Sequence, residues 1–407
     1  MKKLGLAATL LMVMNFLLAQ YVNDNKLFRT VSWQQLCKEI QAKESYMLLD
    51  VRSPGEFSDT SESENYNMGH LKGAINIPLN QLGERLGELE PYHGKTIYVY
   101  CSHSQRSRRG AKLLSEKGFK NVVNVNGGMT QLNLEKNNKV LCGKNIYETK
   151  NAYQLLSPTD VCRIMAEDKT VLVLDIRNDS VYRGISTNEK LNANGRFKKT
   201  LHIPADRISA NMGDIAKDRQ IIVVDDFGDA SPAVAKSLLS NGYRNVGILF
   251  NGMQMWTDMP LKRLPCKDEL VSTRVPYGLL SVEDLGGWMK TNKDALVIDT
   301  RNTEEFRNSS KDSWRNIGNI VRAKNFPAAA IQGKMEELLP FKDKPILLYG
   351  LGSSPEVFGV AKMLTDSGFT QIQVLLNGLF TIRWTAANLE GYSDLKALVT
   401  NVPEENW

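Results

Sequence analysis

The chain repeats one pattern of landmarks three times, and this repeat constrains its fold more than any other feature. Each copy contains an apolar run that ends in Asp-x-Arg, at Asp50, Asp175 and Asp299, which lie 125 and 124 residues apart. The same landmarks then follow in the same order: a Gly and a Pro nine residues apart, a second apolar run, a Gly-aromatic pair and an Asn-Gly pair. Self-similarity at a fixed period is the signature of repeated structural modules. We place three homologous modules at residues 28–138, 152–263 and 278–395.

Within each copy, apolar runs alternate with helical patterns. The runs are short, nearly continuous and rich in β-branched residues, which is typical of strands buried on both faces of a parallel sheet. The clearest runs are residues 96–100, 221–224 and 346–349. A helical pattern over residues 107–117 ends at Gly118, where a helix terminus favours glycine. We therefore expect an α/β fold of three tandem modules, each a mostly parallel sheet flanked by helices. Mixed polar segments predict linkers near residues 138–152 and 263–278.

The first residues have the three parts of a secretory signal peptide. Lys2 and Lys3 form a basic head, residues 4–18 are almost entirely apolar, and Ala19 offers a small residue at the cleavage position. A membrane anchor is the alternative, but the apolar run is shorter than the roughly 20 residues that a spanning helix needs. We expect residues 1–19 to be a signal peptide. The mature protein would then be periplasmic or secreted and would have no membrane span.

Charge and cysteine content exclude several classes of protein. The net charge of +6 is small for 407 residues and is spread along the chain, without the basic stripe and interleaved aromatic residues of a nucleic-acid-binding protein. The four histidines are scattered and there is no CxxC pair, so we expect no metal site. Five cysteines are an odd number, which in an exported protein suggests one free reactive thiol.

Four of these cysteines have structural interpretations that the sequence leaves open. Cys37 and Cys162 lie in helical patterns and are expected in the core, whereas Cys142 and Cys266 lie at module edges. Either edge cysteine could instead accept sulfur from, or resolve, a reactive thiol elsewhere. Disulfides among the four are also possible, and their pairing cannot be read from the sequence.

The second apolar run of the first copy leads into a loop with a cysteine. In α/β sheets, sites form at the carboxyl ends of strands, and the N–H groups at a helix start stabilise anions there. Arg106 adds a permanent cation. Three further basic residues lie close in sequence: His103, Arg108 and Arg109. These surroundings favour a thiolate, so we predict that Cys101 is the catalytic nucleophile. The residues expected to bind the substrate anion are Ser102, His103, Ser104, Gln105, Arg106 and Ser107.

The first module resembles the rhodanese family of sulfurtransferases. The matching residues are Asp50-Val51-Arg52, Glu56-Phe57, residues 69–74, Ile77-Pro78, the loop from Cys101 to Ser107, and Gly127-Gly128. The resemblance implies that the loop cysteine takes a sulfane sulfur from a small donor such as thiosulfate and holds it as a persulfide. It further implies transfer of that sulfur to a thiol or to cyanide, without a metal or an organic cofactor.

Three departures from the family pattern are visible. Ser104 stands where the family loop has glycine, and we expect it to restrict the loop because serine does not readily adopt a positive φ. Leu132 stands where the family often has tryptophan. An insertion near residues 58–67 is rich in serine and acidic residues, and we expect it to be a solvated loop.

The length of the loop separates two chemistries. Four residues lie between Cys101 and Arg106, whereas related cysteine phosphatases have five. The tighter loop suits one additional sulfur atom, so the resemblance favours sulfur transfer over a phosphatase or an arsenate reductase. A loop of the mercaptopyruvate type would end in threonine, and this one does not.

The other two modules lack the nucleophile. Counting back from their Gly-aromatic pairs places Asp225 and Leu351 at the cysteine position, and Ala230 and Glu356 at the position of Arg106. We expect both modules to be inactive and to have structural or recognition roles.

Three functions remain compatible with the sequence: a sulfurtransferase, a persulfide carrier whose protein partner docks on modules two and three, and a purely structural or binding protein. Retention of Cys101 and its basic loop argues against the last. Two more residue roles are expected. Asp50 and Arg52 form a structural ion pair, and His70 is a hydrogen-bonding loop residue rather than a general base.

Overall fold

The computed structural model describes residues 27–42, 45–137, 142–388 and 391–403, and the predicted signal peptide lies outside this part of the chain. The described residues form two compact units. One holds the residues up to 182 together with 196–272, and the other holds residues 183–195 together with those from 273 onward. The first unit contains the sheets of modules one and two, and the second contains the sheet of module three.

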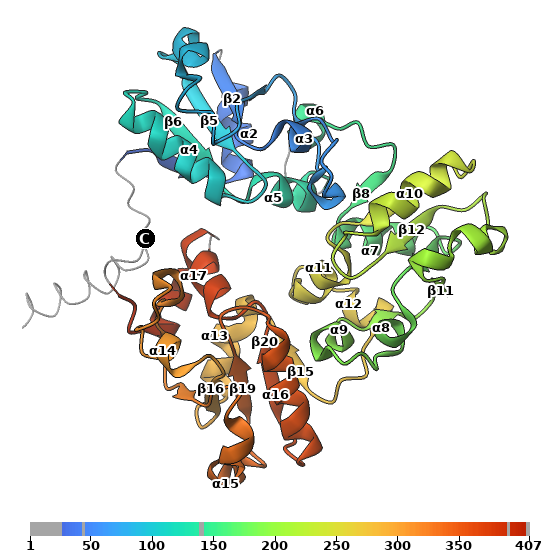
Figure 1. Cartoon of the computed structure of the whole chain (residues 1–407), viewed down its shortest axis with the longest axis vertical. Helices are drawn as coiled ribbons and strands as arrows, with labels where there is room; N and C mark the ends of the chain where they lie inside the picture. Colours follow the sequence, from blue (N-terminus) through green and yellow to red (C-terminus); the bar gives the residue numbers. More distant parts are fainter. Residues whose placement is uncertain (1–26, 43–44, 138–141, 389–390, 404–407) are drawn as a thin grey trace, which may run out of the picture. The chain divides into compact units, whose positions relative to one another are not determined.

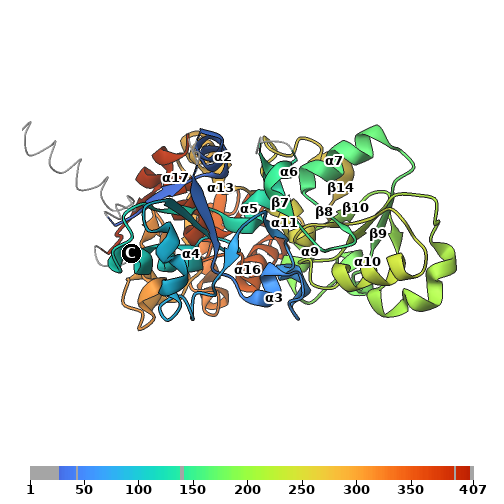
Figure 2. The same ribbon diagram turned by 90° about the horizontal axis from the view of Figure 1, so that it is seen from above.

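The first module is built on a five-stranded parallel sheet in the order β1-β6-β5-β2-β4 (Figure 1). Its strands are β1 (Arg29–Val31), β2 (Tyr46–Asp50), β4 (Ile75–Asn76), β5 (Thr96–Tyr100) and β6 (Val122–Val125). Its helices are α2 (Trp33–Ala42), α3 (Pro54–Phe57), η1 (Glu64–Tyr66), η2 (Leu86–Tyr92), α4 (Gln105–Glu116), α5 (Gly128–Glu135) and α6 (Gly143–Ile146). Alternate residues of β5 belong to two different apolar clusters, one shared with α2 and α5 and the other with α4. Helices therefore cover both faces of the sheet (Figure 2).

The second module repeats this plan with the sheet order β11-β9-β12-β13-β8, again parallel throughout. Its strands are β8 (Gln154–Leu156), β9 (Leu172–Asp175), β11 (Leu201–His202), β12 (Ile221–Val224) and β13 (Val246–Leu249). Its helices are α7 (Pro158–Glu167), α8 (Asp179–Arg183), α9 (Glu189–Ala193), η3 (Ala205–Arg207), η4 (Ser209–Asp214), α10 (Ser231–Ser240), α11 (Gly252–Asp258) and α12 (Lys267–Leu270). One apolar cluster joins the α2 side of module one to the α10 side of module two.

The third module has the parallel sheet order β15-β20-β19-β16-β18. Its strands are β15 (Gly278–Leu280), β16 (Leu296–Asp299), β18 (Lys324–Asn325), β19 (Ile346–Tyr349) and β20 (Ile372–Leu375). Its helices are α13 (Val282–Thr291), α14 (Thr303–Phe306), η5 (Ser313–Arg315), η6 (Ile331–Lys334), α15 (Met335–Leu338), η7 (Leu339–Phe341), α16 (Pro355–Asp366), α17 (Gly378–Asn388) and η8 (Ser393–Leu398). The predicted α/β fold of three modules is thus confirmed.

Each module ends by pairing back on itself. A short antiparallel pair joins the landmark glycine region to the segment after the last helix of the module. These pairs are β3 (His70–Leu71) with β7 (Tyr147–Glu148), β10 (Arg196–Phe197) with β14 (Val271–Ser272), and β17 (Asn319–Ile320) with β21 (Val399–Thr400). The predicted linkers at 138–152 and 263–278 are therefore not free connectors over their described residues, because backbone hydrogen bonds hold them to the preceding module.

Disulfides fasten the same segments in the first two modules. Cys37 in α2 is bonded to Cys142, and Cys162 in α7 is bonded to Cys266. The Cα atoms of the two pairs are 5.5 and 6.1 Å apart, within the usual range. The interpretation of Cys142 and Cys266 as acceptor or resolving thiols is wrong for this disulfide-bonded state, because their sulfurs are already bonded.

The insertion at residues 58–67 is more ordered than the solvated loop that its composition predicts. Asp59 and Asn67 are buried. The Asp59 carboxylate accepts hydrogen bonds from the backbone N–H groups of Gly69 and Lys150 and from the Thr149 hydroxyl. Asp59 therefore ties the insertion both to the landmark glycine and to the returning segment. Composition misled here because a few short polar side chains can hold a loop through backbone contacts.

Candidate active site

Cys101 follows the last residue of β5, at the carboxyl edge of the sheet and between its two neighbouring strands. Its side chain is 1% exposed and lies on the α4 side of the sheet. Its carbonyl oxygen accepts the N–H of Met129 at 2.8 Å, which ties the loop to the start of α5. Gly128 has φ +52°, and an added Cβ there would lie 2.3 Å from the Cys101 oxygen. The Gly127-Gly128 pair thus permits the close approach of two backbones.

Cys101 is the free cysteine of the described residues. Its thiol donates to the hydroxyl of Ser107 at 3.5 Å. Ser107 in turn donates to the carbonyl of Ser104 and to Asn124 Oδ1. The hydroxyl next to the sulfur is therefore fixed by the loop and by β6.

Ser104 does not strain the loop. Its φ is −175°, an extended conformation that any residue adopts, so the expected restriction at this position is wrong. Its hydroxyl accepts the N–H of Gly127 and contacts Asn126 Oδ1, both at 2.7 Å. Where the family has a flexible glycine, Ser104 instead holds the loop by a hydrogen bond from the backbone N–H of Gly127 to its side chain. In module three, Ser353 Oγ accepts the N–H of Asn377 at 2.7 Å in the same way.

Arg106 is anchored by a carboxylate. Its Nη1 and Nη2 donate to the two oxygens of Glu56, each at 2.6 Å, and Nη2 also donates to Ser102 Oγ at 2.8 Å. Burial acts to raise the pKa of Glu56, but the hydrogen bonds from Arg106 and Ser53 outweigh it, so this pKa is lowered. Arg106 therefore fixes the loop to α3 with much of its charge already balanced by Glu56, and its predicted contact with a substrate anion stays a prediction.

The remaining predicted loop residues differ in how far they are exposed. Ser102 is buried beside Arg106, whereas His103 and Gln105 are exposed. Burial of its ring and the charge of Arg106 both lower the pKa of His103. Both effects act against a positive charge on the His103 imidazole, so its expected cationic contribution stays a prediction.

In the second module, the backbone N–H groups of the corresponding loop hold the carboxylate of the loop's own aspartate. Asp225 follows β12 as Cys101 follows β5, which confirms the predicted correspondence. Its carboxylate accepts three backbone N–H groups, from Gly228, Ala230 and Ser231, at 2.6 to 2.8 Å. Burial raises the pKa of Asp225, and the three donors act against this rise. The loop is thus an anion cradle that its own side chain fills. The matching donors in module one are the N–H groups of Ser104, Arg106 and Ser107.

The third module departs from the predicted correspondence. Strand β19 ends at Tyr349, so Gly350 and not Leu351 takes the place of Cys101. The hydrogen bond from Leu379 N to Gly350 O matches that from Met129 N to Cys101 O. This loop is one residue longer than the loop of module one, which is why counting back from the helix end gives the wrong residue. The position has no side chain at all, so the module lacks a nucleophile there.

Asp50 and Arg52 form a buried ion pair, as predicted, and the same pair recurs in modules two and three. Nη2 of Arg52 lies 2.7 Å from Asp50 Oδ2, and both side chains are fully buried. However, Nη1 of Arg52 has no hydrogen-bond partner among the described residues. In module two the same atom of Arg177 approaches Asp226, which occupies the position of Ser102. Arg52 therefore keeps one donor on the side where the loop begins.

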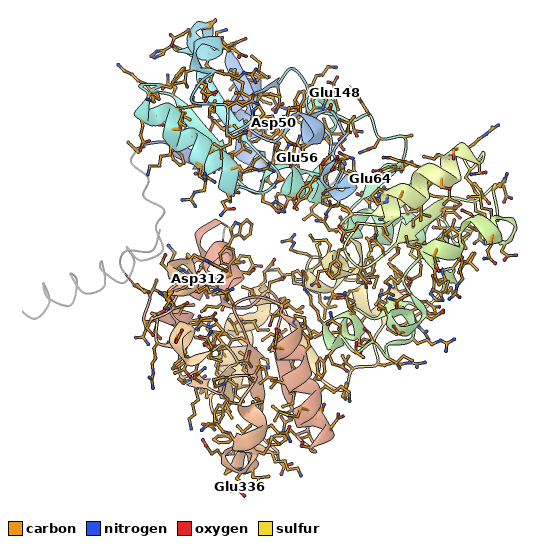
Figure 3. The ribbon with its side chains drawn as sticks, in the orientation of Figure 1. Asp50, Glu56, Glu64, Glu148, Asp312 and Glu336 are labelled. Carbon is orange, nitrogen blue, oxygen red and sulfur yellow. A yellow bond between two sulfur atoms is a disulfide. The ribbon has the colours of Figure 1, made fainter. Side chains whose placement is uncertain are left out.

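His70 lies on the short strand β3 and not in a loop as expected, and it contacts the returning segment. Its Nε2 is 3.5 Å from Glu148, and its ring packs on Phe57 with centroids 4.3 Å apart. The prediction that His70 is not a general base therefore stays a prediction. Figure 3 labels Asp50, Glu56 and Glu148 in this module.

Glu56 and Asn124 are the residues near Cys101 whose roles the sequence does not reveal. Glu56 stands three residues after Ser53, and this spacing already explains it as half of a capping box, which the structure also contains. Its second role depends on a contact across 50 residues. Asn124 lies in an apolar strand, and a buried amide in such a strand is the one signal that could have drawn attention to it.

Comparison with known proteins agrees with this geometry. The family model of the rhodanese-like domain matches residues 33–135, 157–259 and 281–383. The chain therefore belongs to the rhodanese-like family, with three tandem domains.

Several relatives correspond to a single module. The uncharacterized protein YqhL of Bacillus subtilis is 33% identical over 113 residues, which cover 28% of this chain and 79% of YqhL. The thiosulfate sulfurtransferase PspE of Escherichia coli is 34% identical over 88 residues, covering 22% of this chain and 84% of PspE.

A solved thiosulfate sulfurtransferase from Pseudomonas aeruginosa covers 86% of this chain and 66% of its own, at 16% identity and a TM-score of 0.23.

Metal-ligand groups and membrane-spanning helices were both sought in the described part of the chain. No group of three or more His, Cys, Asp or Glu side chains there is arranged to hold a metal ion. None of the described helices combines the length and apolar character that crossing a bilayer requires.

Replacing Glu56 with glutamine is expected to destabilise the first module by about 1–3 kcal/mol at pH 7, because Arg106 loses its partner in a partly buried site. The pKa of Glu56 is lowered in the folded protein, so its contribution is fully present above the ordinary carboxyl value near 4.3 and is lost as the pH falls below it. Denaturant unfolding at pH 7 and in steps down to pH 3 checks this. The exposed Glu62→Gln is the control, and equal stability of both variants at pH 7 would contradict the prediction.

Proposed function

We propose that the protein is a sulfurtransferase in which Cys101 carries sulfur from a small donor of the thiosulfate type to a thiophilic acceptor. The Cys101 thiolate attacks the outer sulfur of thiosulfate. A bond forms between the two sulfurs while the sulfur–sulfur bond of thiosulfate breaks, and its electron pair leaves with sulfite. Cyanide or a thiolate then attacks the outer sulfur of the persulfide, and the Cys101 thiolate is regained.

The carboxylate of Asp225 is the observation that carries this proposal. It lies in the second module's version of the loop and is held by three backbone N–H groups. The corresponding groups at Ser104, Arg106 and Ser107 would hold the negative charge of the outer persulfide sulfur. Such donors cost no reorganisation during transfer, because the fold has already placed them.

The surroundings of Cys101 favour a small donor. The thiol is almost completely buried, and Arg52 keeps an unpaired Nη1 donor on the side where the loop begins. A sulfonate-like oxygen of the donor would satisfy that guanidinium. The alternative, a persulfide carrier served by a protein partner on modules two and three, stays a prediction.

The proposal is tested by the intact mass of the protein after incubation with thiosulfate. We expect a gain of one sulfur atom, located on the peptide that contains Cys101 and removed by cyanide with release of thiocyanate. Alkylation of a separate portion of the same protein must first show that Cys101 is reduced. No gain with a reduced thiol would overturn thiosulfate as the donor, and a gain located on another peptide would overturn Cys101 as the carrier.

We also propose that the protein works outside the cytosol, in the periplasm or the surrounding medium. Four of its five cysteines are paired in disulfides, and such bonds persist in oxidising compartments. The basic and apolar pattern of residues 2–18 supports the same conclusion. Cell fractionation followed by N-terminal sequencing tests the proposal, and an uncleaved protein in the cytosol would overturn it.

A further inference from the structure

Each module carries a segment of variable sequence between its Asp-x-Arg landmark and its landmark glycine. We name these segments the first insertion (residues 58–67), the second insertion (residues 183–194) and the third insertion (residues 307–316). The first two lie against a helix of the module that follows them in the chain. The first contacts α10 through η1, and the second contacts α16 through α9. Each contact lies inside one compact unit, the first in the unit of modules one and two and the second in the unit of module three.

Each of these insertions brings an acidic residue near the same lysine position of the receiving helix, by a direct hydrogen bond in the first case and by charge in the second. Lys236 of α10 donates to Glu64 of the first insertion at 2.8 Å. The pKa of Lys362 in α16 is raised by its hydrogen bond to Asp366 and further by the charge of Glu189 in the second insertion. Both lysines stand six residues before the glycine of the Gly-aromatic pair.

Apolar contact accompanies the charges in the second case. Ala193 of the second insertion belongs to the same buried cluster as Phe358 of α16 and Tyr277. Phe358 lies four residues before Lys362, so both side chains are on one face of the helix. The repeated element is therefore an insertion that places an acidic side chain near the same lysine position of the next module's helix, and in the second case an apolar side chain accompanies it.

Among the three modules, one insertion and one receiving helix have no counterpart of this kind. The third insertion has no following helix among them, and it is markedly exposed: Trp314 is 54% and the Asp312 side chain 63% exposed. Asp312 lies 3.3 Å from Arg315, whose guanidinium also lies over the indole ring of Trp314 at 4.5 Å. Exposed pairs of this kind are weak and can change partner. Figure 3 labels both Glu64 and Asp312.

The other unmatched half is α4, which has no preceding insertion among the three modules. Lys112 of α4 stands six residues before Gly118, the position of Lys236 and Lys362, and its side chain is 60% exposed. Its ammonium group lies 3.8 Å from the Glu116 carboxylate, which makes a weak exposed pair. Arg109 lies exposed one turn earlier on α4. Guanidinium and ammonium groups pack well on an indole face, so this basic surface complements Asp312 and Trp314.

We propose that the third insertion of one copy of this chain docks on α4 of a second copy, with Asp312 facing Lys112 and Trp314 packed on the helix. The interface joins two different surfaces, so it builds closed rings or open chains of copies rather than a symmetric pair. It repeats between copies the contact that joins successive modules within one copy.

Sedimentation velocity of the purified protein over a concentration series tests the proposal. The wild type is expected to exceed the mass of one chain as its concentration rises. Trp314→Ser and Lys112→Glu should each self-associate at least about tenfold more weakly, because each removes the centre of one half of the interface. Leu339→Ser and Lys120→Glu are the controls, since they change an exposed apolar residue and an exposed lysine elsewhere.

Mixing the two variants distinguishes this arrangement from others. Trp314→Ser keeps an intact α4 surface, and Lys112→Glu keeps an intact third insertion. Their mixture should therefore form a one-to-one pair that cannot grow further. A wild type that stays at the mass of one chain would overturn the proposal. Undiminished association of the Lys112→Glu variant would overturn it as well, because the third insertion would then have another partner. Neither residue takes part in sulfur transfer, so loading of Cys101 should be unchanged.

Discussion

Replacing Cys101 with serine is expected to abolish the transfer of sulfur from thiosulfate to cyanide, lowering the turnover number by at least about 1000-fold. A serine hydroxyl cannot form a persulfide at this position. The substitution keeps the shape of the side chain, and the Ser107 hydroxyl remains available as a hydrogen-bond partner. The protein should therefore unfold at nearly the same temperature as the wild type. Thiocyanate release at saturating thiosulfate is the measurement.

Cys101→Ala is the matched control, because it removes the possibility of a weakly nucleophilic serine. Both variants should lack activity to the same extent. The disulfide cysteines offer no substitute, since Cys37 lies in the apolar cluster on the α2 side of the sheet and Cys101 lies on the α4 side. More than a tenth of wild-type turnover in either variant would contradict the assignment of Cys101 and would direct attention to a nucleophile outside the loop.

The repeat made most of the fold predictable. The runs at residues 96–100, 221–224 and 346–349 are strands with those bounds, because buried parallel strands need continuous apolar sequence. Helix ends were less certain: α4 begins at Gln105, two residues before the start of the predicted helical pattern. The first turn of a helix needs no intrahelical N–H partners, so polar residues such as those at its start give little periodic signal.

The candidate site was predictable only in part. The position of Cys101 after a strand follows from its place behind an apolar run. The partner of Arg106 does not, because Glu56 comes from another helix and its local spacing already has a complete explanation as a cap. The sequence also predicted the wrong residue at the cysteine position of module three, Leu351 instead of Gly350, because this position depends on contacts that a count along the chain does not contain. Loop length is set by contacts in three dimensions, and counting along one chain cannot detect a single added residue.

The inactive modules carry structural information about the active one. Asp225 fills the second cradle with its own carboxylate, whereas Gly350 offers no side chain to the third loop. In module three, the glutamate that corresponds to Glu56 is Glu305, and it pairs with Arg315 instead of a loop arginine. A buried carboxylate at this position thus keeps an arginine partner even where the loop has lost it. This fits a requirement for charge balance that is independent of catalysis.

Removing the disulfide between Cys37 and Cys142 is expected to destabilise the first module by about 2–5 kcal/mol. The bond closes a loop between residues 105 apart in sequence. Constraint of the unfolded chain by a loop of about 100 residues is worth roughly 4.7 kcal/mol, and measured losses are often smaller. The bond also holds the returning segment whose strand β7 pairs with β3 beside His70. A double Cys37→Ala and Cys142→Ala variant should therefore show a calorimetric transition at least about 5 °C lower.

Comparison with the reduced wild type separates the bond from the side chains. If the disulfide itself provides the stability, the double alanine variant and the wild type with that bond reduced should unfold at similar temperatures. Cys101 lies on the other side of the sheet, so sulfur loading below the transition should persist in both.

The second bond, Cys162–Cys266, spans a nearly equal separation of 104 residues and provides an internal standard, since its removal should act on module two with a similar magnitude. A protein produced in a reducing cytosol would lose both contributions, so its folding should depend on an oxidising compartment, in line with the location proposed above. Unchanged transitions after reduction of both bonds would contradict this dependence.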